Sequence, residues 1–414
     1  MHTVHVLGGD LTALAAALRL SRLGHRVHIG TDDPRWTPSS TSPLHLELEP
    51  VLELPSVWRD LCAKTGRNME ADLLEAGVSL VEAPSAVHDG LILPTERGAQ
   101  ISAVRESFDE AIAQRWTGVL DEADDLWQTR RAWGLEHAVV ERPTLADVPS
   151  AFPQKGRRDT LRLLARELPG QLGQVLADLS ARRGGCRDGA TLLLADLAVQ
   201  RVFGRWQLVD ADGPTDVQPL LDVLAARLER RGVRVVETTE LPLSPDVVID
   251  TRVSPPSAGG PLRALRARRH APFLAPTVTT STRPATDADA ADVLSEFVTH
   301  EGGLPVVTWN WRRGDVVVTR VHDHSRPIEA PHLGPGMAVA TWAARPPMTW
   351  QVVDGVPTLH AGPDGHGGPE PWARVLAGAL ATYAVHEHLT GHDVRPTNRL
   401  IGAAGRPRRR HEQP

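Results

Sequence analysis

Cysteine is nearly absent from this chain of 414 residues, which holds only Cys62 and Cys186. The two do not form a C-x-x-C motif, and no spacing in the sequence pairs them. A disulfide-rich scaffold and a cysteine-bound zinc site are therefore not supported. So few cysteines fit a reducing compartment, and we expect a cytoplasmic protein.

Long apolar runs are missing, and so is an excess of positive charge. No hydrophobic stretch reaches the length that crosses a membrane. The first strand pattern begins at Thr3, so we expect no signal peptide. The formal net charge is −6, which argues against nucleic acid as a partner.

Several catalytic signatures are absent as well. The sequence holds neither a P-loop nor a serine nucleophile elbow. His322 and His324 could share one face of a strand, whereas His386 and His388 would face different sides of a helix. We interpret both pairs as polar surface. We therefore expect no metal site, and we assign no catalytic residue.

A strand–turn–helix–strand pattern is present at the start of the chain, from Thr3 to Asp33. A short apolar run ends at Gly8 and Gly9, and an apolar helix pattern follows from Leu11 to Leu23. This order predicts the βαβ unit that opens a dinucleotide-binding domain.

The glycine fingerprint of this turn is incomplete, since its three positions are Gly8, Asp10 and Ala13. Gly8 allows the tight turn, and Ala13 is small enough for close helix–strand packing. Asp10 puts a negative charge where the backbone would approach a pyrophosphate, but aspartate is also a favourable helix N-cap. Two interpretations stay open: a cofactor site with one altered residue, and a structural helix capped by Asp10.

The length and the element pattern predict two domains in an α/β fold. The first is a Rossmann-like domain with a parallel sheet and helices, and the second is an α+β substrate or cap domain with an antiparallel sheet. The first domain takes residues 1–85, 205–260 and 352–395, the second takes 86–204 and 261–351, and 396–414 form a flexible tail.

Two local patterns lead to further predictions. Apolar and polar residues largely alternate from Leu44 to Leu54, which predicts a strand. The stretch from Trp309 to Asp315 predicts a hairpin that turns near Gly314. Trp309 and Trp311, together with Trp342 and Trp350, either line an apolar pocket or belong to the core.

Near its end the chain reads AGPDGHGGPEPWARVLAG, from Ala361 to Gly378, between a strand pattern and a helix pattern. Together with the opening turn and the helix–strand pattern of Val217 to Val236, this segment resembles the flavin-dependent phytoene desaturase and amine oxidase superfamily. The resemblance spans nearly the whole chain. The family segment reads AGxxTHPGGGxPGAVLSG, and the identical positions are Ala361, Gly362, His366, Gly368, Val375, Leu376 and Gly378.

The resemblance implies FAD as cofactor, with a helix N-terminus aimed at the flavin and its phosphates. In this family the flavin accepts a hydride from a C–H bond beside nitrogen or in an isoprenoid chain, and the protein supplies position and an apolar pocket. The residues that the match assigns to cofactor binding are Gly8, Gly9, Ala13, Asp32, Gly362, His366 and Gly368.

Several positions depart from the family pattern. The acid expected to bind the ribose falls on Thr31, so Asp32 takes this role only after a shift of one residue. The family's GGR segment is missing, because residues 35–43 contain no glycine. Paired glycines midway are replaced by Thr215 and Asp216. Each loss weakens the expected hold on the flavin.

Three functions follow as hypotheses. The first is an FAD-dependent oxidoreductase that acts on a small or apolar metabolite. The second is a pseudoenzyme that has kept the fold, lost the flavin and now binds or stabilises a partner protein. The third is a nicotinamide-dependent oxidoreductase, which Asp10 obstructs in the same way as it obstructs FAD.

Overall fold

The computed structural model describes residues 1–144, 161–185, 191–242, 244–253, 272–289, 293–334, 342 and 345–396. The predictions for Cys186 and for the tail beyond residue 396 lie outside these residues.

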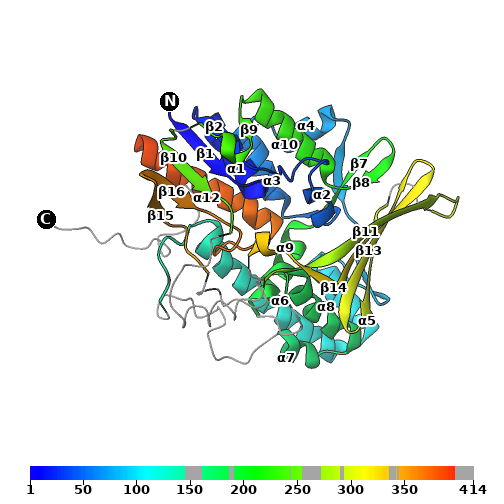
Figure 1. Cartoon of the computed structure of the whole chain (residues 1–414). Coiled ribbons are helices and arrows are strands. Elements are labelled where there is room, and N and C mark those ends of the chain that lie inside the picture. Colours follow the sequence, from blue (N-terminus) through cyan, green and yellow to red (C-terminus); the bar gives the residue numbers. More distant parts are fainter. Residues whose placement is uncertain are drawn as a thin grey trace.

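A six-stranded sheet begins with the first residues of the chain (Figure 1). Its neighbouring strands are parallel, except that edge strand β15 runs antiparallel to β16. In order across the sheet the strands are β15 (Trp350–Val353), β16 (Val356–His360), β10 (Val247–Asp250), β1 (Thr3–Leu7), β2 (Arg26–Gly30) and β9 (Arg234–Val236). Val4 and Val6 of β1 are fully buried, as expected for a strand covered on both faces.

Two helices from opposite ends of the chain pack together beside this sheet. They are α1 (Leu11–Arg22) and α12 (Pro371–Thr390). The contact is close at Gly378, where an added Cβ would lie 2.7 Å from Thr12 O and 2.8 Å from Ala15 Cβ. The other helices of this part are α3 (Pro55–Thr65), α4 (Met69–Glu75) and α10 (Gln218–Arg230).

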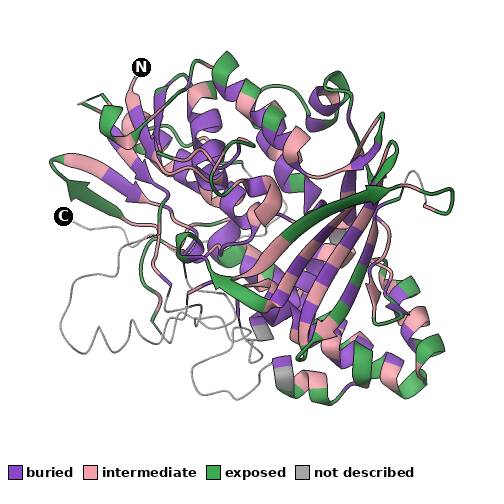
Figure 2. Cartoon of the chain, turned by 45° about the vertical axis from the view of Figure 1, so that its right-hand side comes forward, coloured by how far each residue is buried: buried purple, intermediate pink, exposed green. Residues whose placement is uncertain are grey.

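A second six-stranded sheet is antiparallel, apart from the parallel pairing of β12 with β5. In order its strands are β11 (Leu274–Pro284), β14 (Val316–Glu329), β13 (Leu304–Arg313), β12 (Ser295–Glu301), β5 (Val87–His88) and β6 (Leu91–Ile92). The predicted hairpin is confirmed, since Arg313 pairs with Val316 across Gly314. Figure 2 shows buried and half-buried residues alternating along these strands.

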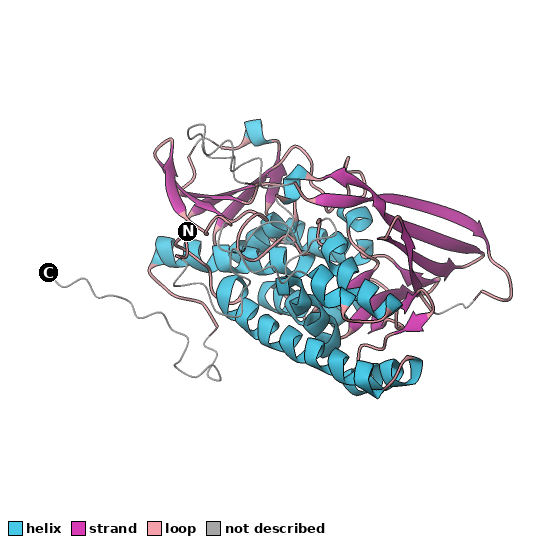
Figure 3. Cartoon of the chain, turned by 90° about the horizontal axis from the view of Figure 1, so that it is seen from below, coloured by secondary structure: helices cyan, strands magenta, loops and turns pink. Residues whose placement is uncertain are grey.

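Helices fill the space between and below the two sheets (Figure 3). Trp116 of α6 and Leu172 of α8 belong to the main hydrophobic core, which continues into the parallel-sheet part. These helical segments are α5 (Arg97–Ser107), α6 (Glu110–Arg130), η1 (Arg131–Leu135), α7 (Leu161–Arg166), α8 (Gly170–Arg182), η2 (Thr191–Leu194) and α9 (Ala195–Phe203).

The predicted strand from Leu44 to Leu54 is wrong in its first half. Leu44–Glu47 form the short helix α2, and only Val51–Glu53 pair as strand β3. The alternating pattern also places Leu44 and Leu48 four residues apart, so one helical turn buries both, and Leu48 N donates to Leu44 O over 2.8 Å. The remaining segments are β4 (Ser79–Glu82), β7 (Arg205–Asp210), β8 (Gly213–Thr215), η3 (Thr238–Glu240) and η4 (Pro331–Leu333).

The fold class is the predicted one. It is α/β, with a Rossmann-like part built on the parallel sheet and a second α+β part built on the antiparallel sheet. The domain boundaries themselves stay a prediction. Among the described helices, none is both long and apolar enough to span a membrane.

Candidate functional site

The glycine turn between β1 and α1 is tightly covered by the segment that follows β2. Gly8 has a φ of +129°, and its N–H donates to Gly30 O over 3.0 Å. A Cβ on Gly9 would overlap Asp33 O, and Arg35 N donates to Gly9 O over 2.9 Å. The turn is therefore packed against protein backbone at Gly9.

Asp10 caps α1, as one of the two interpretations of the sequence required. Its Oδ1 accepts hydrogen bonds from the N–H groups of Thr12 and Ala13, both over 3.2 Å. Burial raises the pKa of Asp10, although Arg374 acts in the opposite direction. The Asp10 side chain is 14% exposed. An anion at this helix end would need the N–H groups that Asp10 already binds.

A cluster of ion pairs lies next to Asp10. Glu47 accepts a hydrogen bond from Arg35 over 2.7 Å and one from Arg374 over 2.6 Å. Arg374 Nη1 lies 4.0 Å from Asp10 Oδ2. Burial alone would raise the pKa of Glu47, but Arg374, His332 and Arg35 hold it well below its ordinary value. Two guanidinium groups are thus balanced by two carboxyl groups of the chain.

The acidic residue proposed for a ribose contact is engaged elsewhere. Asp32 Oδ1 accepts a hydrogen bond from the N–H of Thr238 in η3 over 3.1 Å. Thr31, at the end of β2, donates its hydroxyl to Asp33 O over 3.1 Å. Both side chains therefore tie together loops at the end of the sheet.

The glycine-rich segment before α12 lies against a cavity of about 30 Å³. Gly362, His366 and Gly368 all line it, so the structure brings together the three site residues predicted for this end of the chain. Burial lowers the pKa of His366 to about 4, and its Nδ1 lies 3.1 Å from Pro346 O.

Gly8 and Gly362, from opposite ends of the chain, meet on either side of the segment after β10. A Cβ on Gly8 would overlap Thr251 Oγ1, and a Cβ on Gly362 would overlap Arg252 O. Ala13 is fully buried on α1 beside α12. The seven predicted residues therefore gather around the carboxyl ends of β1, β2, β10 and β16, where ligands of such sheets bind.

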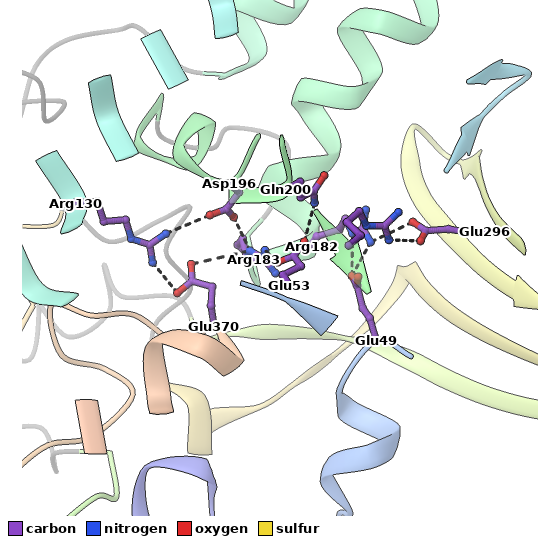
Figure 4. A network of polar contacts seen from close by, with 10 residues as sticks. Glu49, Glu53, Arg130, Arg182, Arg183, Asp196, Gln200, Glu296 and Glu370 are labelled. Atoms are coloured by element: carbon purple, nitrogen blue, oxygen red, sulfur yellow. Dashed lines mark hydrogen bonds and ion pairs between the residues drawn. The ribbon is translucent and has the colours of Figure 1, made fainter. Parts of the chain in front are cut away.

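A network of buried charges lies between the Rossmann-like part and the cap helices (Figure 4). Arg130 of α6 donates to Glu370 over 2.7 Å and to Asp196 of α9 over 3.2 Å. Arg183 joins Asp196 over 2.6 Å and Glu53 of β3 over 3.0 Å.

The network continues to the antiparallel sheet through Arg182. This residue donates to Glu49 over 2.7 Å and to Glu296 of β12 over 3.4 Å. Glu296 also binds Arg205. Sequence reasoning missed the whole network, because its partners are up to 240 residues apart and follow no spacing.

A cavity of about 80 Å³ borders both clusters. It is lined by Glu49, Arg182 and Arg374, together with His322 and His324. The prediction that these histidines are polar surface is wrong, since they are 2% and 6% exposed. They do share one face of β14, but that face is turned inward, and burial lowers the pKa of each to about 3.

In the second pair His388 is exposed, as the prediction of polar surface required, and only His386 departs from that prediction. His386 is 9% exposed, and its Nδ1 lies 2.9 Å from Nε2 of His25. Within the described part of the chain, no group of three or more histidine, cysteine or acidic residues is placed to hold a metal ion.

The four tryptophans considered for a pocket lie in different places. Trp309 and Trp311 belong to the core of the antiparallel sheet. Trp342 packs edge-on against His366, and the centroids of the two rings are 4.6 Å apart. Trp350 is 39% exposed on β15. Core packing therefore explains Trp309 and Trp311, and the four do not form one pocket.

The residues at the first turn do not fit a dinucleotide pyrophosphate. The N–H groups at the start of α1 are bound by Asp10, Gly9 is covered by backbone, and the nearby guanidinium groups are paired with Glu47. The terminal glycine-rich segment does keep a cavity beside its predicted residues.

No family model matches the sequence, and no curated protein matches it. Solved structures do. An oxidoreductase from Methanosarcina mazei is 12% identical, with 93% of this chain and 100% of that chain covered and a TM-score of 0.53. Cyclohexylamine oxidase from Brevibacterium oxydans is 11% identical, with 94% and 99% covered and a TM-score of 0.53. A triple mutant of putrescine oxidase is 12% identical, with 94% and 99% covered and a TM-score of 0.50.

These similarities show the fold. It is the fold shared by oxidoreductases and amine oxidases, as the resemblance of the sequence implied. At such identities they do not assign a reaction or a cofactor.

Proposed function

We propose that this chain is a flavin-free member of the oxidoreductase fold, which acts by binding a partner protein or a small molecule and not by hydride transfer. One observation carries the proposal: Asp10 binds the N–H groups of Thr12 and Ala13, the groups on which a pyrophosphate at this helix would depend.

Charge supports the same conclusion. A pyrophosphate brought to this turn would meet the carboxyl groups of Asp10 and Glu47, while Arg35 and Arg374 already have carboxyl partners. The four groups together carry no excess of positive charge that would attract a pyrophosphate to this turn.

The visible absorption spectrum of the purified full chain tests this proposal, before and after incubation with FAD and gel filtration. We expect no flavin bands in either sample. Flavin bands in the wild-type protein, whether co-purified or taken up, contradict the proposal.

Two variants isolate the role of Asp10. Asp10→Gly removes the side chain, whereas Asp10→Asn keeps an oxygen that can cap α1 and removes the charge. Uptake of FAD by both variants would assign the obstruction to charge, and uptake by Asp10→Gly alone would assign it to the occupied N–H groups. Equal uptake by the wild-type chain would show that Asp10 is no obstacle.

A second candidate is an FAD-dependent oxidoreductase that removes a hydride from a small or apolar metabolite. The cavity at Gly362, His366 and Gly368 favours it, because these residues match the family segment that faces the flavin. A bound flavin would supply the electron acceptor, and these residues would hold it. The same spectrum decides between the two candidates. A nicotinamide cofactor is less favoured, since its pyrophosphate meets the same Asp10.

A partner protein in the cytoplasm is part of the first proposal. The tagged chain is isolated from its own cells under mild conditions, and its mass is measured by light scattering. We expect a mass that no whole number of copies of this chain accounts for, because a different protein is bound. A monomer without any bound component would contradict the partner-binding form of the proposal and leave the small-molecule form.

A further inference from the structure

A separate cavity of about 50 Å³, called here the cap cavity, lies inside the helical part of the chain. Elements α5, α6, α8 and α9 contribute to its wall, together with β5 and β7. Its wall includes His88, Arg182, Arg201 and Arg205, with Asp178 as the acidic residue. Arg182 also borders the cavity beside the buried network, so its side chain lies between the two cavities.

Three nitrogen atoms of this wall are shielded from solvent and have no hydrogen-bond partner among the described residues. They are His88 Nδ1, Arg201 Nε and Arg205 Nε. Arg205 is only 3% exposed. A buried guanidinium Nε–H is almost always satisfied in folded proteins, by the chain, by water or by a ligand. Arg201 and Arg205 already donate through Nη2 to Asp124 and Glu296, so the donors left without an acceptor are their Nε–H groups. Burial lowers the pKa of His88 to about 4, so its neutral ring donates from one nitrogen only.

The acidic group on the wall does not supply that acceptor. Both oxygens of Asp178 lie close to His300 Nε2, at 3.0 and 3.1 Å. Burial alone would lower the pKa of His300, but hydrogen bonds and charge from Asp178 and Asp89 raise it overall. Both oxygens of Asp178 are therefore engaged by His300, which is not among the residues that line the cavity.

The rest of the wall is largely apolar, with Leu93, Val175 and Leu197 among its residues. The volume exceeds the 10–15 Å³ that one water needs and is well below the ~150 Å³ of a cavity that holds benzene. An apolar wall suits a ligand with a short hydrocarbon tail, and the nitrogen atoms suit a planar anion.

We propose that the cap cavity binds a short-chain carboxylate of roughly two to four carbons, with its oxygens toward Arg201 and Arg205 and its tail against the leucine side chains. The glycine turns take no part in this site. Binding of a carboxylate there therefore does not depend on whether the chain binds FAD. Phosphate and other inorganic anions offer the charge without the tail that the apolar wall selects.

Titration calorimetry of the full chain with propionate tests the proposal. Propionamide has the same size without the charge, and propylamine has the opposite charge. We expect propionate to bind at least tenfold more tightly than propionamide, and propylamine to give no heat of binding. Equal affinity for propionate and propionamide, or no heat with propionate, overturns the proposal. Inorganic phosphate binding as tightly as propionate overturns the assignment to carboxylates.

The chain offers a matched pair of arginine variants. Arg201 and Arg97 both pair with Asp124, but only Arg201 lines the cap cavity. Because Asp124 keeps one arginine in either variant, Arg201→Gln and Arg97→Gln should fold equally well. We expect at least tenfold weaker binding of propionate in Arg201→Gln and unchanged binding in Arg97→Gln. Unchanged binding in both contradicts the site.

A third variant, Leu197→Phe, fills the cavity without removing a donor. It should abolish binding while circular dichroism still reports the folded chain. If this variant does not fold, His88→Ala replaces it, with weaker binding expected. If the folded variant binds propionate as tightly as the wild-type chain does, the carboxylate binds outside the cap cavity.

Discussion

At the level of single residues, side chains of the chain itself surround the N-terminal end of α1. Asp10 binds the first N–H groups of α1, and Glu47 pairs with Arg35 and Arg374. The first N–H groups of α1 and the guanidinium groups of Arg35 and Arg374 therefore all have carboxyl partners within the chain, although some nitrogen atoms of both arginines remain without a hydrogen-bond partner among the described residues.

A single methyl group at Gly378 should destabilise the protein. Alanine normally stabilises a helix relative to glycine by about 1 kcal/mol, but here the new Cβ would press on Thr12 O and Ala15 Cβ of α1. Overpacking of this kind costs about 1–3 kcal/mol. We expect Gly378→Ala to lower the free energy of unfolding by about 1 kcal/mol, measured by urea denaturation.

Gly118 provides the matched control for this prediction. It also lies within a helix, α6, but a Cβ there would meet no atom within 4 Å. Gly118→Ala should therefore raise stability by about 0.5–1 kcal/mol. The two alanine variants should have opposite signs, and a gain in both would show that α1 and α12 can move apart without cost.

At the level of elements, the buried network joins segments that the backbone leaves unconnected. Arg130 of α6 is fully buried and contacts Glu370, which precedes α12, and Asp196 of α9. Replacing one partner of a buried ion pair leaves an uncompensated charge, which costs more than the pair contributes. The network therefore fixes how the cap helices sit against the Rossmann-like part.

Arg130→Gln should lower the free energy of unfolding by about 3–5 kcal/mol, because Glu370 and Asp196 would lose a buried cation. Arg97→Gln is the control, since Arg97 pairs with the more exposed Asp121 and Asp124 at a site worth about 0–1 kcal/mol. Urea denaturation of both variants measures the difference. Similar losses in the free energy of unfolding for the two variants would mean that water reaches Glu370 and Asp196 and compensates for the missing cation.

Local elements could be predicted from the sequence because the signals are local. The glycine turn, the helix cap at Asp10 and the hairpin at Gly314 depend on residues close in the chain. The Leu44–Leu54 segment shows the weakness of the same method, because its spacing of apolar residues suits a strand and a helical turn alike.

The candidate site could be predicted only in part. Gly8 and Gly362 come together as the resemblance implied, but the cluster of Arg35, Glu47 and Arg374 depends on pairing across as many as 327 residues. Such pairs leave no periodic trace in one sequence. The inward face of His322 and His324 was missed for the same reason, since β14 is covered by segments distant in the chain.

At the level of the whole molecule, buried histidines make stability depend on pH. Burial is the main cause of their lowered pKa values. In the most affected histidines the pKa falls from 6.5 to about 4 or about 3. The five with the largest effect are His25, His88, His322, His324 and His366.

A histidine with a lowered folded pKa takes up fewer protons when folded, so stability is full above pH 6.5 and falls as pH drops from 6.5 toward 4. As the pH falls from about 7 to about 5, we expect the free energy of unfolding, measured by urea denaturation, to decrease by an amount on the order of 1 kcal/mol for each well-buried histidine. His322→Phe should flatten this dependence.

His300 should behave in the opposite way. Its pKa is raised overall by Asp178 and Asp89, despite burial. The stability it contributes is full below pH 6.5 and is lost as pH rises through the raised pKa. His300→Gln should therefore cost more stability in mildly acid solution than in mildly alkaline solution, and the same loss at both would contradict the assignment.

The packing of α1 against α12 has a consequence for synthesis on the ribosome. About 360 residues separate the contact surfaces of Leu11–Arg22 and Pro371–Thr390. At about 5–20 residues per second, α1 waits roughly 20–70 s for its partner helix. During that time its apolar face is open to chaperones and to neighbouring nascent chains. The Rossmann-like part can close only after Pro371–Thr390 has been synthesised, so until then the face of α1 that α12 covers stays open.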